Sequence, residues 1–330
     1  MDTGSHIMIG FGLGALAQID PVISNNSALS TAVLIGTVVG SNAPDFDFIY
    51  RLKGKSSYYR NHRGWSHSLP AIPIWGLLIA SLIHLFFLGT SFSHLLLWTL
   101  LAVIIHVLTD LFNVNGTQAL RPFTQKWLSL DFLPLIDPYI IMLHILGFSL
   151  LPFFDTGRIF TFIYLAMVFY LIVRLISTNF IKWKITQHFQ NALLVKMIPK
   201  TSPFHWNIII ETNQDFLFGS YSKGELWIEH TFSKKIDYPR LVMESRQNPQ
   251  VESFIRSNPF AYPFVQKRKN GYFIYWKDLR FRSKKFFPKL AIMLISLDYQ
   301  NQVSYTGKLT SIKHYKKVIK KLETSIKLKS

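Results

Sequence analysis

Long runs of apolar residues in the first half of the chain constrain its fold more than any other sequence feature. Four such runs are nearly free of Asp, Glu, Lys and Arg: Leu69–Leu88, Leu95–Thr109, Leu133–Phe154 and Ile159–Phe180. About 20 apolar residues span the hydrocarbon core of a bilayer, so each run is predicted to form a transmembrane helix. Two shorter segments rich in Gly and Ala, Ile7–Ile19 and Ala28–Gly40, are predicted to add a closely packed helical pair, because small residues let membrane helices approach each other.

The distribution of positive charge orients these six predicted helices. Residues 49–68 and 113–133 contain Lys and Arg, whereas the loops around residues 20–27, 89–93 and 155–157 contain neither. Lys and Arg collect on the cytoplasmic side of membrane proteins. With six spans, both termini and both basic loops are therefore predicted to be cytoplasmic.

The second half of the chain has a different composition. Residues 1–180 carry a net charge of +1, whereas residues 181–330 carry +17. Short β-rich runs, a hairpin signal at Lys269-Asn270-Gly271 and a Lys-rich amphipathic helix at Ser311–Lys327 are typical of an α+β domain. The predicted fold is an α-helical membrane bundle of about six helices at residues 1–181, followed by a basic cytoplasmic α+β domain at residues 182–330.

The secondary structure of the second half is predicted in more detail from its β-rich runs and turn residues. A short helix is predicted at Pro249–Ser257. The predicted strands are Trp206–Thr212, Phe216–Ser220, Leu226–Phe232, Tyr262–Lys267, Tyr272–Phe281, Leu290–Leu297 and Val303–Leu309.

Histidine and aspartate residues of the first half gather at the predicted cytoplasmic ends of its helices. His106 and Asp110 are four residues apart and share one helix face. An imidazole and a carboxylate that project together can bind one metal ion, and ionisable groups at membrane depth point to function. We therefore predict a divalent metal site, with zinc or manganese favoured. Its predicted ligands are His6, Asp45, His62, His67, His106 and Asp110.

Each of these residues also has a simpler interpretation. A lone histidine at a membrane boundary is usually an interfacial residue, and His106 and Asp110 alone could form a buried hydrogen-bonded pair. The chain has no cysteine, so a metal would need nitrogen or oxygen ligands. The gathering of all six side chains at one end of the bundle favours the metal site over these alternatives.

Two sequence blocks carry most of these polar residues: H-R-G-x-S-H-S at His62–Ser68, and H-x-x-x-D-x-F-N-x-x-G-T-Q beginning at His106. Together with other segments, they resemble the YdjM/YfhP-like family of membrane-bound metal-dependent hydrolases. The other similar segments are Met1–His6, Pro44–Asp47, Arg121–Phe123, Leu130-Asp131, Ile136–Pro138, Pro203–Trp206 and Asp278–Phe281. The resemblance covers nearly the whole chain, and it implies a multi-pass hydrolase of the bacterial inner membrane without supplying its substrate.

The leading hypothesis is metal-assisted hydrolysis of an ester or phosphoester at the cytoplasmic leaflet, on an amphiphilic, lipid or lipid-linked substrate. Asp47 or a histidine that does not bind the metal is the candidate base, and Arg63 is the candidate group for holding a phosphate or oxyanion. Asn113, Gln118 and Asp137 are predicted to orient the ligands. The alternative is a non-enzymatic, membrane-tethered regulatory module whose basic C-terminal domain binds anionic lipid, nucleic acid or a protein partner. Nucleic acid is the least favoured partner, because the sequence shows no nucleic-acid-binding motif.

Overall fold

The structure is a computed structural model that describes residues 1–53, 57–58, 61–281, 287–298 and 301–327. The chain divides into two compact units, and each is described here by itself. Unit 1 contains Met1–Asp47, Arg63–Asn213 and Leu217–Thr231. Unit 2 contains Phe48–His62, Gln214–Phe216 and Phe232–Ser330.

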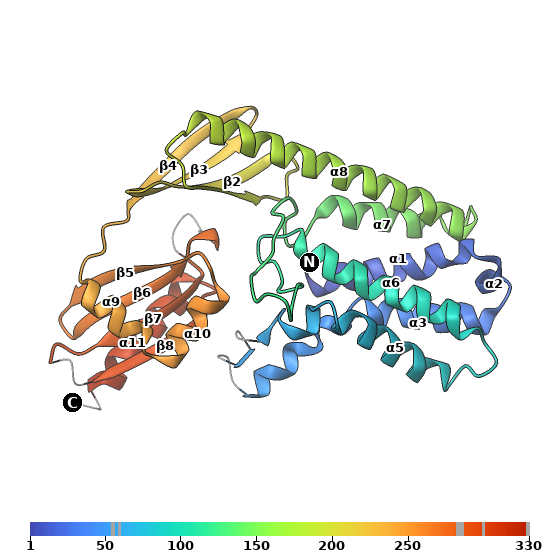
Figure 1. Cartoon of the computed structure of the whole chain (residues 1–330), viewed down its shortest axis with the longest axis horizontal. Helices are drawn as coiled ribbons and strands as arrows, with labels where there is room; N and C mark the ends of the chain where they lie inside the picture. Colours follow the sequence, from blue (N-terminus) through green and yellow to red (C-terminus); the bar gives the residue numbers. More distant parts are fainter. Residues whose placement is uncertain (54–56, 59–60, 282–286, 299–300, 328–330) are drawn as a thin grey trace. The chain divides into compact units, whose positions relative to one another are not determined.

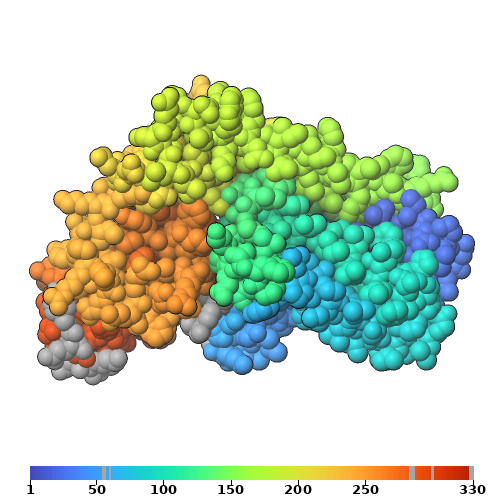
Figure 2. All heavy atoms as spheres, viewed as in Figure 1, coloured from blue at the N-terminus to red at the C-terminus, as the bar shows by residue number. Residues whose placement is uncertain are grey.

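Unit 1 begins with a group of helices and 3-10 segments (Figure 1). The helices are α1 (Thr3–Leu16), α2 (Pro21–Ser24), α3 (Ser27–Gly40), α5 (Ala71–His84), α6 (Phe92–Leu111), α7 (Pro138–Leu150) and α8 (Thr156–His188). The 3-10 segments are η1 (Ala17–Ile19), the first part of η2 (Ala43–Lys53), whose residues from Phe48 onward belong to unit 2, and η3 (Trp65–His67). Side chains fill the space between these helices, as the space-filling view shows (Figure 2).

Glycine lets α1, α3 and α6 pack closely, as the small residues of the first two helices predict. A Cβ atom on Gly10 would lie 2.4 Å from the Ser41 Oγ atom. A Cβ atom on Gly36 would lie 2.3 Å from the Thr99 Oγ1 atom of α6. Both distances are shorter than van der Waals contact, so a larger residue at either position would push the helices apart.

Two described helices, α6 and α8, are long and apolar enough to cross a membrane. Helices α3, α5 and α7 are apolar but have 14, 14 and 13 residues, which rise about 20 Å against a hydrocarbon core of about 30 Å. The prediction of a helical first half is confirmed, but the prediction of six spanning helices is not. Helices α5 and α7 are shorter than the apolar runs that contain them; α7, for example, begins only at Pro138, where Asp137 caps it.

A first antiparallel sheet follows α8 and supports the loop between α6 and α7. Its strands, in spatial order, are β1 (Leu194–Pro199), β2 (His205–Glu211), β3 (Asp215–Ser222) and β4 (Glu225–Ser233). The Lys196 ammonium group on β1 forms a 2.6 Å ion pair with Asp131 in that loop. Arg174 of α8 donates a 3.1 Å hydrogen bond to the Phe132 carbonyl oxygen. These contacts fix the loop that follows His106 and Asp110.

Unit 2 contains a second four-stranded antiparallel sheet with helices on both faces. Its strands, in spatial order, are β5 (Ala261–Arg268), β6 (Gly271–Asp278), β7 (Lys289–Ile295) and β8 (Gln302–Lys308). Its helices are α9 (Pro239–Arg246), α10 (Pro249–Ser257) and α11 (Ile312–Lys327), and η4 (Leu279–Phe281) follows β6. Alternate β6 residues point to opposite faces, so Ile274 packs with Phe254 of α10, whereas Phe273 packs with Leu322 of α11.

The strands predicted from the second half correspond to β2 through β8. The hairpin predicted at Lys269-Asn270-Gly271 joins β5 and β6, with Arg268 paired to Gly271. The helices predicted at Pro249–Ser257 and Ser311–Lys327 correspond to α10 and α11. Two elements, β1 and α9, were not predicted, because neither segment has a clear period of apolar residues.

Candidate metal centre

Four segments that are distant in the sequence meet at one end of the unit 1 helices. The N-terminus lies beside the C-terminal end of α6 and the loop that follows it (Figure 1). Helix α1 carries His6 in its first turn, η2 carries Asp45, η3 carries His67, and α6 carries His106 and Asp110 near its end. Five of the six predicted ligands therefore lie in one region of unit 1. The sixth, His62, belongs to unit 2.

Four of these side chains converge tightly, and we call Asp45, His67, His106 and Asp110 the His/Asp cluster. One ligand atom from each lies within 4.8 Å of the other three. The Nε2 atom of His67 is 3.2 Å from the Nε2 atom of His106 and 3.3 Å from the Oδ2 atom of Asp110. Only the Asp45 side chain, which is 20% exposed, reaches solvent. The cluster is therefore approached from the Asp45 side.

The hydrogen bond of His106 to the backbone determines which of its nitrogen atoms faces the cluster. Its Nδ1 atom lies 2.6 Å from the carbonyl oxygen of Ser41. A carbonyl oxygen only accepts hydrogen bonds, so Nδ1 carries the proton and donates it. In the neutral ring, Nε2 then presents a lone pair to the cluster.

The same reasoning applies to His67 through two neighbouring side chains. The Ser66 hydroxyl donates a 2.8 Å hydrogen bond to the Oδ2 atom of Asp47. The Ser66 oxygen is therefore an acceptor for the Nδ1 atom of His67, which is 2.9 Å away. Asp47 also accepts a 2.8 Å hydrogen bond from the main-chain N–H of Arg63. Asp47 thus orients His67 so that its Nε2 lone pair also faces the cluster.

Four electron-rich atoms consequently face one another in a buried space. Within the described part of the chain, Oδ1 of Asp45 and Oδ2 of Asp110 have no hydrogen-bond partner. Buried anionic oxygens are costly unless a cation or a proton compensates them. Two imidazole nitrogens and two carboxylate oxygens form a donor set that suits zinc, manganese or iron. The residues present therefore fit a divalent metal ion.

The charges in the cluster also alter the pKa values of His67 and Asp45. Burial alone would lower the pKa of the His67 imidazole, but the carboxylates of Asp110 and Asp45 raise it above its ordinary value. Burial likewise opposes ionisation of Asp45, but the neighbouring His67 and His106 imidazoles hold the pKa of Asp45 well below its usual range. Both directions describe a site that attracts positive charge.

The second oxygen of Asp110 is already occupied by other groups. Its Oδ1 atom is 2.9 Å from Nη2 of Arg63, contacts the main-chain nitrogen of Met1, and accepts a 3.4 Å hydrogen bond from Asn113. The guanidinium group of Arg63 also lies 3.4 Å from the side-chain oxygen of Asn113. These contacts leave Oδ2 as the carboxylate oxygen of Asp110 that faces the two histidines.

Two further predicted site residues of unit 1, His6 and Gln118, do not join the cluster. His6 stacks on His106, with ring centroids 3.8 Å apart, and its Nε2 atom is 3.5 Å from Oδ1 of Asp110. Gln118 donates a side-chain hydrogen bond to the Gln125 carbonyl oxygen at 2.6 Å, and its main-chain N–H donates to the Arg63 carbonyl oxygen at 3.0 Å. Gln118 therefore stabilises the loop beside Arg63.

Sequence reasoning missed two groups that orient the histidines. Ser66 lies within the H-R-G-x-S-H-S block, so its position beside His67 offered a signal. The Ser41 carbonyl oxygen offered none, because a main-chain acceptor has no residue-type preference and its role depends on the packing of α3 against α6.

The contacts of Asp47 make a specific prediction. Asp47→Ala should weaken divalent metal binding about 10- to 100-fold, as is usual when a hydrogen bond that orients a metal-binding histidine is lost. Isothermal titration of the purified full chain with zinc measures this effect. Asp155→Ala is a suitable control, since Asp155 caps α8 rather than contacting the cluster. Unchanged zinc affinity in Asp47→Ala would contradict the orienting role.

Two family models and a curated relative match this chain. The model described as YdjM inner membrane protein matches residues 1–181, and the model described as YfhP C-terminal alpha/beta plait domain matches residues 240–319. A protein of Bacillus subtilis (strain 168), described as Uncharacterized protein YfhP, is 36% identical over 323 residues, which cover 97% of this chain and 99% of the relative. No solved structure matches the chain.

Proposed function

Because this chain belongs to the YdjM inner membrane protein family, we propose that it is a membrane-bound, metal-dependent hydrolase whose metal site is the His/Asp cluster. The resemblance seen in the sequence is confirmed by the family model and by the relative. One observation carries the proposal. Two imidazole lone pairs and two buried carboxylate oxygens face a common point, and among the described residues the oxygens lack hydrogen-bond donors.

Asp45, His67, His106 and Asp110 would hold the ion, and zinc or manganese fits their donor atoms. A divalent ion in such a site makes water a stronger acid and polarises an ester or phosphoester oxygen. Asp47 would keep the His67 ring in its binding orientation through Ser66. In this proposal His6, which stacks on His106, is a further candidate ligand or proton acceptor.

The guanidinium group of Arg63 would contribute positive charge beside the cluster. It lies 2.9 Å from Asp110 and is buried, so it is pre-positioned to stabilise a developing negative charge. Asn113 would hold this group in place through its side-chain oxygen. Gln118 would position the loop beneath it.

An amphiphilic substrate, such as a lipid or a lipid-linked ester or phosphoester, agrees best with the surroundings of the cluster. The segments that carry or adjoin the cluster have four exposed apolar side chains: Phe46, Trp65, Leu120 and Phe123. The Arg121 guanidinium lies over the Trp65 ring at 5.4 Å. Exposed apolar side chains next to a polar site can hold acyl chains. We place the site at the cytoplasmic leaflet, because residues 49–68 and 113–133 are basic.

Metal removal tests the proposed function directly. Full-length protein purified in mild detergent should contain about one divalent ion per chain, measured by elemental analysis. Chelation should abolish hydrolysis of a fluorogenic phospholipid, and zinc or manganese should restore it. Protein that is metal-free as purified, and that binds neither zinc nor manganese in a titration, would refute the metal site. Metal-loaded protein that hydrolyses none of a panel of ester and phosphoester lipids would refute the hydrolase assignment alone.

A further inference from the structure

Unit 2 contains a pocket that is separate from the His/Asp cluster, and we call it the β8 pocket. It has a volume of about 630 Å³ and lies along strand β8 between α11 and the start of α10. Strand β8 is at the edge of its sheet. Pockets of about 300–1,000 Å³ hold small organic ligands. The β8 pocket is therefore large enough for a molecule the size of a nucleotide.

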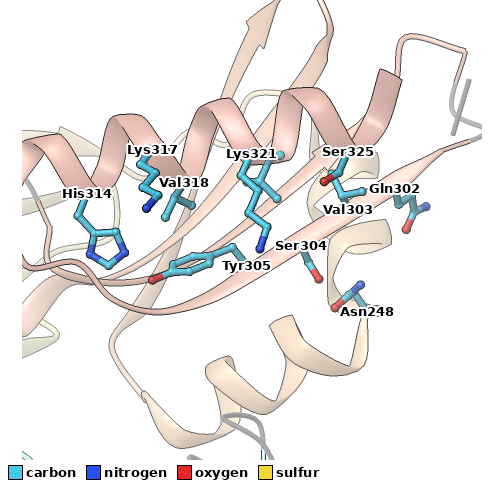
Figure 3. Close-up of a pocket in the computed structure, with 11 residues that line it drawn as sticks. Asn248, Gln302, Val303, Ser304, Tyr305, His314, Lys317, Val318, Lys321 and Ser325 are labelled. Atoms are coloured by element: carbon cyan, nitrogen blue, oxygen red, sulfur yellow. The ribbon is translucent and has the colours of Figure 1, made fainter. Parts of the chain in front are cut away.

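Helix α11 supplies the positive charge of this pocket. His314, Lys317 and Lys321 lie on one helix face, because they are three and four residues apart. Their side chains extend from α11 toward Tyr305 and Ser304 of β8 (Figure 3). Within the described part of the chain, neither lysine forms an ion pair with a carboxylate, although the helix also carries Glu323.

The remaining walls combine apolar surface with hydrogen-bonding groups. The apolar side chains are Val303, Val318, Leu322 and the ring of Tyr305, and the polar side chains are Asn248, Gln302, Ser304 and Ser325. Among the described residues, no aspartate or glutamate lines the pocket. Outside the lining, Glu244 accepts a 2.6 Å hydrogen bond from Gln302. The lining is therefore positively charged, with one aromatic face.

We propose that the β8 pocket binds a phosphate-bearing organic molecule, with its phosphate groups against Lys317 and Lys321 and its apolar or planar part against Tyr305 and Val303. Ammonium groups on one helix face form strong, charge-assisted hydrogen bonds with phosphate oxygens. An aromatic ring and aliphatic side chains on the opposite wall favour a ligand that also has an apolar portion. Such a site would give the C-terminal domain a ligand-sensing role independent of the proposed hydrolysis.

Helix α11 offers a matched control for its two pocket lysines. Lys316 and Lys320 are one position earlier at the same spacing and exposed, and they do not line the pocket. Lys317→Ala/Lys321→Ala and Lys316→Ala/Lys320→Ala therefore remove the same charge from the same helix. Only the first pair removes it from the pocket.

The test uses full-length protein in nanodiscs of neutral phosphatidylcholine, with a chelator present so that the metal site does not contribute. ATP and inorganic triphosphate are titrated by calorimetry, and water-soluble dihexanoylphosphatidic acid represents a lipid headgroup. Lys317→Ala/Lys321→Ala should weaken probe binding at least about tenfold, and Lys316→Ala/Lys320→Ala should change it less than about twofold. Tyr305→Leu should weaken the binding of ATP but not the binding of triphosphate.

The probes distinguish the source of the phosphate. Lysine-dependent binding of ATP supports a soluble ligand, and lysine-dependent binding of dihexanoylphosphatidic acid alone supports a lipid headgroup. Equal losses in the two lysine pairs would overturn the proposal, because they would indicate general attraction to a basic surface. A wild-type protein that binds none of the three probes would overturn it as well. Thermal unfolding of each variant excludes misfolding as the cause of a loss.

Discussion

His106→Ala is expected to lower the affinity of the purified protein for zinc by more than about 100-fold, beyond the loss that follows removal of a supporting hydrogen bond. The substitution deletes one of the two nitrogen atoms in the His/Asp cluster. It leaves the Nε2 atom of His67 facing two carboxylates without its neighbour 3.2 Å away. Elemental analysis of the purified variant, followed by zinc titration, measures the loss.

The same helix supplies the control for this substitution. His94 is also on α6, but its Nε2 atom is 3.4 Å from Asp20 and its Nδ1 atom contacts Ser91. His94→Ala should therefore retain the metal content of the wild type. If His94→Ala and His106→Ala lose metal equally, the loss reflects damage to α6 and the proposed ligand role of His106 is wrong.

Asp110→Asn gives an independent measure of the oxygen ligands. Asparagine keeps the shape of the side chain but removes its negative charge, so metal affinity should fall together with the attraction to Arg63. The guanidinium of Arg63 is 2.9 Å from Asp110, and an unpaired buried charge costs about 3–5 kcal/mol. A thermal unfolding measurement must therefore accompany the metal analysis. Asp110→Asn protein that is folded and retains full metal content would exclude Asp110 as a ligand.

Asp278→Ala is expected to destabilise unit 2 by about 3–5 kcal/mol. Asp278 is fully buried, and its oxygens lie 2.8 Å and 3.0 Å from the guanidinium nitrogens of Arg280. The substitution would leave Arg280 buried without its partner. Amide hydrogen exchange in β6 and β7 of the full-length protein measures the loss strand by strand. Glu252→Ala breaks the exposed 2.9 Å pair with Arg256 and should cost less than about 1 kcal/mol.

The pH dependence of the Asp278–Arg280 ion pair has a definite sign. Burial opposes ionisation of Asp278, but the Arg280 guanidinium holds the pKa of that carboxyl below its ordinary value. The folded state therefore releases this proton more readily than the unfolded state. The stabilisation is present above about pH 4, the unfolded pKa, and is lost as the pH falls further. Asp278→Ala should show less acid-dependent loss of protection in β6 and β7 than the wild type, and an equal loss would contradict this assignment.

Local sequence patterns predicted much of the second half because its signals act over a few residues. The hairpin at Lys269-Asn270-Gly271 and the amphipathic period of α11 are of this kind. The lengths of the helices in the first half were harder to predict. Hydropathy shows where apolar residues lie, but it does not show where a helix begins and ends. Helices α5 and α7 are both shorter than their apolar runs, because caps and turns set the helix boundaries. Asp137, for example, caps α7 at Pro138.

The residue types and spacing by themselves determined that the first half is apolar and helical, and that it carries an unusual set of histidines and aspartates. The i, i+4 spacing also placed His106 and Asp110 on one face. Only the tertiary structure decided that Asp45 and His67 join them, while His6 stacks on His106. The physical reason is that a ligand set depends on distances between atoms from separate elements and on hydrogen bonds, such as the one from His106 to the Ser41 carbonyl oxygen. Neither the distances nor the acceptor atoms are encoded in a local pattern.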